Sequence, residues 1–167
     1  FLASKSSVQQ GYSVAEPIYI ENQGKFKPVV HLLADNGFST YSTLIEARTD
    51  FVLDKPDLVR RFVDASIVGW YNYLYADRKA ANAMMRKENP ELTDDELERS
   101  VALIKQQGIV DSGEALERGI GAMNEARVRD FYEKMVKAGL YKPGEVDIRK
   151  VATYDFVNRS VGRELRR

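Results

Sequence analysis

The chain has 167 residues, of which 44% are hydrophobic and 30% charged, a balance typical of a folded globular protein and not of a disordered one. Its 25 basic and 25 acidic residues cancel, which argues against partners recognised by net charge, such as nucleic acid or anionic lipid. The absence of cysteine excludes disulfides, thiolate metal sites and cysteine nucleophiles. No apolar run approaches the roughly 20 residues that a membrane helix needs.

The first part of the chain predicts short strands. Residues 8–14 form one of them, because Pro17 disfavours helix at the residue before it and turns the chain into a loop. A helical turn is expected over residues 17–23. The apolar run over residues 27–35 predicts a second strand, although a run this short is also compatible with helix. Residues 42–48 carry β-branched side chains and predict a third strand.

Helices dominate the remainder of the chain. Asp54 is expected to cap a helix that has Pro56 in its first turn, where a missing N–H is tolerated. The apolar residues of this helix recur at helical spacing, which predicts a single stripe facing the core. The stripe consists of Val59, Phe62, Val63, Ile67, Trp70 and Leu74.

The later helices have recognisable end signals. Thr93 with Glu96 forms a capping box, and Gly108 ends the helix that this box begins. The basic tail over residues 163–167 is interpreted as a solvated helix end. Helices are also expected over residues 77–89, 124–138 and 148–158.

The polar residues with the strongest claim to a function lie at two predicted junctions between a strand and a loop. The first junction carries Tyr12, Ser13 and Glu16, and the second carries Tyr41 and Ser42. A carboxylate that accepts N–H bonds, flanked by tyrosine rings, suits a small planar or cationic solute. No nucleophile and base accompany these residues, which favours binding over catalysis and predicts neither metal nor cofactor. For the first junction, an ordinary surface turn is the alternative.

Four other motifs favour structural roles. The only histidine, His31, lies in an apolar run, and no second histidine exists to share a metal. The glycine turn over residues 119–124 lacks the third glycine of a dinucleotide-binding turn. The acidic residues 94–98 fit the first turn of a helix better than a metal site. The aromatic run over residues 70–75 is expected to pack in a core or an interface.

Strands come early and helices late, without the alternation of a complete α/β domain. Such strands would complete a sheet begun elsewhere, so we expect the chain to be the C-terminal part of a longer protein. Unpaired strand edges then predict association, either as a domain-swapped dimer or with the N-terminal half of that protein.

Three motifs carry a resemblance to a known family. They are G-Y-x-x-x-E-P at residues 11–17, L-L-A-D-x-G at residues 32–37, and the long stretch from NPELTDDELERS to GIGAMNEAR at residues 89–127. With them, almost the whole chain resembles the solute-binding proteins of ABC importers. More narrowly, it is similar to the NMT1/THI5-like group, whose members bind thiamine-pyrimidine precursors, sulfonates, nitrate or riboflavin.

The resemblance implies an α/β fold, type II periplasmic-binding-protein-like and partial. Residues 1–36 would be the end of the second lobe, residues 37–43 the return crossover, and residues 44–167 the helix-rich C-terminal half of the first lobe. The protein would be periplasmic, or extracellular and membrane-associated. It would hold a small-molecule solute between two lobes and deliver it to ABC permease subunits, without acting as an enzyme.

The resemblance also nominates residues. In pyrimidine-binding members, a glutamate at the position of Glu16 contacts the ligand, so Tyr12 and Ser13 would lie beside the solute. Tyr41 and Ser42 would reach it from the crossover. Two alternatives stay open: a pyrimidine-synthase-like enzyme of the same fold, which the absence of cysteine disfavours, and a small helical interaction module.

Overall fold

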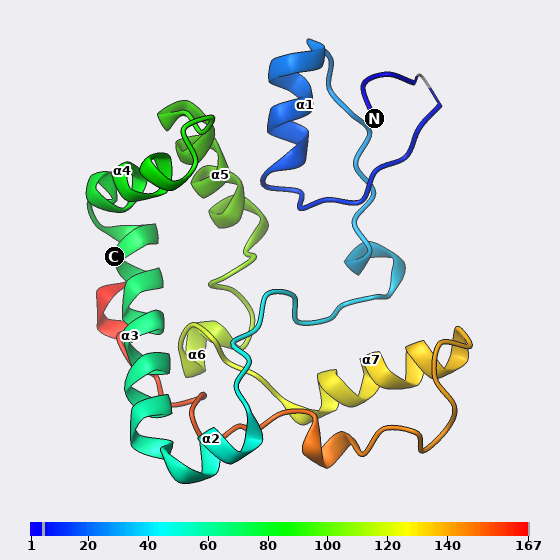
Figure 1. Cartoon of the computed structure of the whole chain (residues 1–167), viewed down its shortest axis with the longest axis vertical. Helices are drawn as coiled ribbons and strands as arrows, with labels where there is room; N and C mark the ends of the chain where they lie inside the picture. Colours follow the sequence, from blue (N-terminus) through cyan, green and yellow to red (C-terminus); the bar gives the residue numbers. More distant parts are fainter. Residues whose placement is uncertain (5, 167) are drawn as a thin grey trace.

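The structure is a computed structural model that describes residues 1–4 and 6–166. All regular secondary structure in this part of the chain is helical (Figure 1). Three short 3₁₀ helices are η1 (Ala34–Asn36), η2 (Ile148–Lys150) and η3 (Arg163–Leu165). The α-helices are α1 (Glu16–Gly24), α2 (Thr49–Asp54), α3 (Pro56–Tyr75), α4 (Lys79–Glu88), α5 (Asp94–Gln107), α6 (Ala115–Arg118) and α7 (Glu125–Lys137).

The predicted α/β, type II periplasmic-binding-protein-like fold is wrong for this structure, because the described residues contain helices and no strand. The segments expected as strands, residues 8–14, 27–35 and 42–48, have no strand structure. Val8 and Val29 within them are 97% and 83% exposed. A strand is stabilised by hydrogen bonds to a neighbouring strand, and these segments have none beside them in the described chain.

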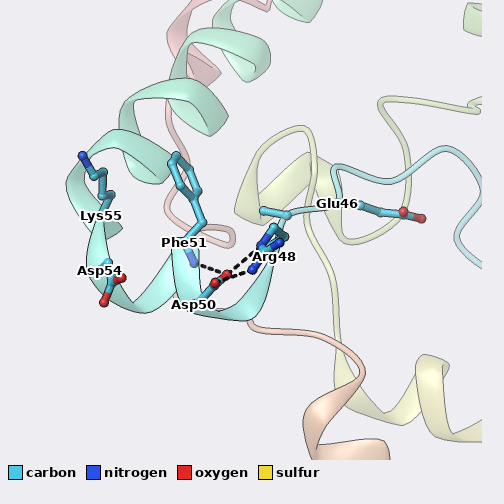
Figure 2. A pocket seen from close by; sticks show the side chains of 7 residues that line it. Glu46, Arg48, Asp50, Phe51, Asp54 and Lys55 are labelled. Carbon is cyan, nitrogen blue, oxygen red and sulfur yellow. Dashed lines mark hydrogen bonds and ion pairs between the residues drawn. The ribbon is translucent and has the colours of Figure 1, made fainter.

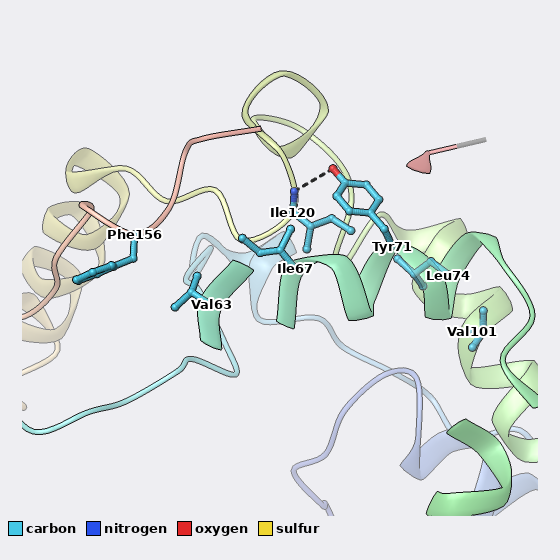
Figure 3. Close-up of a cluster of buried hydrophobic side chains, with 7 residues drawn as sticks. All are labelled: Val63, Ile67, Tyr71, Leu74, Val101, Ile120 and Phe156. Carbon is cyan, nitrogen blue, oxygen red and sulfur yellow. Dashed lines mark hydrogen bonds between the residues drawn. The ribbon is translucent and has the colours of Figure 1, made fainter. Parts of the chain in front are cut away.

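Helix α3 organises the core. Val63, Ile67, Tyr71 and Leu74 lie at intervals of four, four and three residues, so all of them fall on one face, and all are buried. They pack in one cluster with Val101 of α5 and with side chains from two later loops, Ile120 and Phe156 (Figure 3).

The predicted apolar stripe of α3 was correct in its spacing and partly wrong in its members. Tyr71 is fully buried, and its hydroxyl accepts a hydrogen bond of 3.2 Å from the backbone N–H of Ile120. Trp70, expected in the core, is 41% exposed, and Phe62 is 60% exposed. Both side chains point away from the face that carries Ile67 and Leu74, which are four and seven or eight residues apart from them in the wrong phase of the helix.

Local signals placed the later helices well. The capping box of α5 is confirmed: the Thr93 side chain accepts from the Glu96 backbone, and Glu96 accepts from the backbone N–H of Thr93. Gly108 ends α5 in the left-handed conformation, as expected. The prediction for Asp54 is wrong, because this residue ends α2 and does not cap α3. The helix expected over residues 148–158 is reduced to η2.

The C-terminal segment is fixed by a buried ion pair and is not the solvated tail that its charge predicted. Arg166 pairs with Asp111, whose side chain is only 3% exposed. The hydroxyl of Tyr75 donates to the same carboxylate over 2.7 Å, and Arg166 also donates to the carbonyl oxygen of Ala115 over 2.9 Å. A buried carboxylate needs such partners, so these bonds tie the chain end to α3 and α6. Arg167 lies outside the described residues.

The elements are spread out rather than stacked in layers (Figure 1). Helix α1 contacts α5, the C-terminal helix η3 lies along α3, and α7 contacts η2. In the described part of the chain, every helix is too short or too polar to cross a membrane.

Core membership on α3 can be tested with two neighbouring faces of the same helix. Leu74→Ala removes a side chain that is 1% exposed, so the free energy of unfolding should fall by about 2–5 kcal/mol. Trp70→Ala should cost roughly 1 kcal/mol, because this ring is already partly in water. Urea unfolding followed by circular dichroism measures both. A larger loss for Trp70→Ala than for Leu74→Ala would contradict the described core.

Candidate functional site

The first predicted cluster lies at the start of α1 and is closed on itself. Glu16 is the first residue of α1, and its carboxylate accepts a 2.6 Å hydrogen bond from the backbone N–H of Tyr12. Gly11 makes this turn feasible, because a Cβ at that position would lie 2.7 Å from Glu16 Cδ. The Ser13 hydroxyl donates to Gln107 Oε1 of α5 over 2.7 Å, while Tyr12 is 59% exposed.

Polar contacts between α1 and α5 hold this turn in place. Asn22 donates to Glu96 over 2.9 Å and accepts from Arg99, which also pairs with Glu21. Burial alone would raise the pKa of Glu96, but hydrogen bonds from Asn22 and Thr93 and the charge of Arg99 outweigh it, so the pKa is lowered. Glu96 is therefore an ionised acceptor that anchors α1.

The second predicted cluster is part of a larger network that brings three separate segments together. The Tyr41 hydroxyl donates to Glu114 Oε1 over 2.6 Å and accepts from the backbone N–H of Asn124 over 2.9 Å. The Asn124 side-chain amide donates to both carboxylate oxygens of Glu114, at 3.0 and 2.9 Å. We call Tyr41, Glu114, Asn124 and Arg127 the Tyr41 network.

Arg127 completes the Tyr41 network from α7. Its guanidinium carbon lies 4.4 Å from the centre of the Tyr41 ring, a cation–π geometry. The same guanidinium donates to the carbonyl oxygens of Ser39 and Thr40, at 3.3 and 3.1 Å. Asn124 caps α7 by accepting from the Arg127 backbone N–H over 2.8 Å. The helix cap thus sets the position of both the amide and the guanidinium.

The electrostatics of the Tyr41 network favour one protonation state. The Tyr41 hydroxyl lowers the pKa of Glu114 by donating to it, and Asn124 and the positive charge of Arg127 add to the effect against the opposing influence of burial. Burial and the hydrogen bond to Glu114 raise the pKa of Tyr41. At neutral pH the network therefore contains a carboxylate and a neutral phenol.

The structure does not gather the five sequence-predicted residues into one site. Tyr12, Ser13 and Glu16 belong to the contact between α1 and α5, whereas Tyr41 is bonded to residues of α7 and of the turn before α6. Ser42 is exposed next to Tyr41. The other three members of the Tyr41 network, Glu114, Asn124 and Arg127, were missed.

One signal could have found the missing residues. Asn124 precedes an amphipathic helix and is a typical N-cap, so its side chain had to lie near the turn that begins α7. Glu114 had no such signal, because a glutamate in a Gly-rich turn is usually solvated.

Two surface hollows offer weaker sites. The hollow over α2, with a volume of about 450 Å³, is lined by Arg48, Asp50, Phe51 and Lys55 among others (Figure 2). Arg48 and Asp50 pair with each other over 2.6 Å at the exposed surface, so their charges are already satisfied. Such exposed pairs contribute little to stability or to recognition.

Comparison with known proteins identifies no relative: no family model, no curated protein and no solved structure matches the chain.

The pKa of Glu114 gives a prediction for stability against pH. Because folding lowers this pKa, the stabilisation is fully present above pH 4.5, the ordinary pKa of a glutamate, and is lost as the pH falls through the lowered value. Glu114→Gln should therefore be less stable than the parent at neutral pH, and the gap should close in acid. Urea unfolding of both proteins along a pH series measures the gap. A gap that is independent of pH would contradict an ionised Glu114 in the network.

Proposed function

We propose that the chain captures a small polar or aromatic solute as part of the extracytoplasmic solute-binding component of an ABC importer, which delivers the solute to permease subunits. Its sequence resemblance to that class of proteins supports the proposal, although the two-lobe fold of that class does not. The observation that carries the proposal is the Tyr41 network. It places an aromatic ring, an ionised carboxylate and a guanidinium within hydrogen-bonding reach of one another.

The chemistry of the network suits a solute that bears N–H groups. Glu114 Oε2 accepts a hydrogen bond from Asn124 alone among the described residues, so a solute N–H can add to it or replace the amide. A bond to an ionised carboxylate is stronger than one between neutral groups. The thiamine-pyrimidine type of solute has such N–H donors on a planar ring.

The remaining groups act as positioning elements. Arg127 covers one side of the Tyr41 ring and is held there by the carbonyl oxygens of residues 39–40. Its charge also stabilises the ionised form of Glu114. Removing Arg127 should therefore loosen the ring and weaken the acceptor together.

Solute binding at Glu114 can be tested by calorimetry after a thermal-shift screen of the chain against pyrimidines, sulfonates, nitrate and flavins. For a solute found in the screen, Glu114→Gln should weaken binding by about 1–3 kcal/mol, because a charge-assisted bond is lost. Glu117→Gln is the matched control on α6, since Glu117 is exposed and lies outside the network. Equal affinity in Glu114→Gln and Glu117→Gln would remove the network from the binding site.

Glu16 provides a separate test of the residues that the family resemblance nominates. If its carboxylate binds the solute, Glu16→Gln should weaken binding by about 1–3 kcal/mol as well. If it only closes the turn at Tyr12, the substitution should lower stability slightly and leave the affinity unchanged. An affinity lost in Glu16→Gln and kept in Glu114→Gln would move the solute from the Tyr41 network to the start of α1.

A further inference from the structure

Helix α3 carries a second stripe on the face opposite the core. Leu58, Phe62, Ala65, Gly69 and Asn72 follow one another at intervals of four, three, four and three residues. This is the spacing of the seam in a coiled coil, and it places all five side chains on one face. All five residues are exposed, so no part of the described chain covers the stripe. We call these five residues the outer stripe of α3.

A helix that is apolar on two opposite faces is normally buried on both. Here the inner face is buried, with Leu74 and Tyr71 at 1% and 0% exposure, whereas Phe62 and Leu58 on the outer stripe are 60% and 44% exposed. Burying a large apolar side chain contributes about 1.5–3 kcal/mol, and the described chain leaves this contribution unused on the outer stripe. The asymmetry points to a partner surface.

The total exposed area indicates how large the partner interface is. A compact monomer of 19.0 kDa exposes about 8,400 Å². This chain exposes 12148 Å². The excess, roughly 3,700 Å², exceeds what a transient contact buries and lies in the range of obligate homodimers.

We propose that the outer stripe of α3 is a homodimer interface, in which two copies of α3 pack antiparallel. The stripe is complementary to itself. Around a twofold axis near Ala65, Phe62 of one copy faces Gly69 of the other, and the same contact recurs on the opposite side of the axis. A Cβ at Gly69 would have no atom of the described chain within 4 Å, so this position is an open hole for the phenylalanine ring.

Charge and packing are consistent with a second copy as the occupant. The chain has no net charge, so two copies do not repel each other over long range. Small residues at the centre of the stripe, Ala65 and Gly69, let two helix backbones approach closely, while Leu58 and Phe62 supply apolar area at the ends. The interface does not depend on the solute proposed above, and it differs from an exchange of segments at the crossover over residues 37–43.

Sedimentation velocity of the whole chain at micromolar concentration tests the proposal. The parent should sediment as a dimer. Gly69→Leu should raise the dimer dissociation constant about tenfold or more, because the hole for Phe62 is filled. Leucine favours helix over glycine, so this variant keeps α3 folded. Met84→Lys is the control, because Met84 lies on α4 and is 71% exposed away from the stripe.

Three results would overturn the homodimer. They are a parent chain that sediments as a monomer, a Gly69→Leu variant with an unchanged dissociation constant, and native mass spectrometry that finds a different polypeptide in the complex. Phe62→Lys supplies a second variant on the stripe. It should dissociate the dimer as strongly as Gly69→Leu, while circular dichroism checks that its helix content is retained.

Discussion

The burial of one face of α3 is the constraint on which the rest of the structure depends. This helix supplies four of the seven side chains in the buried cluster, and α5 and the loops before α7 and η3 each add a residue to it. Tyr71 links this apolar core to the backbone of the turn at Ile120 through its hydroxyl. Because a single helix face holds these segments, the chain has a narrow core and a large exposed area.

Polar contacts organise what the narrow core does not reach. The pair of Arg166 with buried Asp111 fixes the C-terminal segment against α3 and α6. The Tyr41 network does the same for the long segment before α2, which has no regular structure of its own. These contacts join residues more than 50 positions apart, so they serve the fold as well as the proposed site.

The sequence predicted features that depend on neighbours along the chain and failed for those that depend on distant ones. The capping box at Thr93, the stop at Gly108 and the bounds of α7 are local, and the structure confirms them. The strands were wrong because apolar, β-branched runs favour strand only where another strand is available for pairing. A resemblance in sequence did not predict the helical fold of this chain.

The candidate site shows the same division. Tyr41 was found from sequence because an aromatic residue among hydroxyl side chains is unusual, but its partners Glu114 and Arg127 lie 73 and 86 positions further along the chain. On α3, periodicity identified the inner stripe and assigned Trp70 to it, although Tyr71 is the buried residue. Helical spacing alone does not fix the phase when apolar residues occur on both faces.

Amide hydrogen exchange, followed by mass spectrometry of the whole chain, tests most directly whether α3 is the centre of the fold. The slowest exchange should occur in α3 over residues 63–74, where the buried face protects the helix, and residues 8–14 and 42–48 should exchange rapidly because they have no strand partner. Slow exchange in residues 8–14 and 42–48, together with rapid exchange in α3, would contradict this structure and would indicate a paired sheet instead.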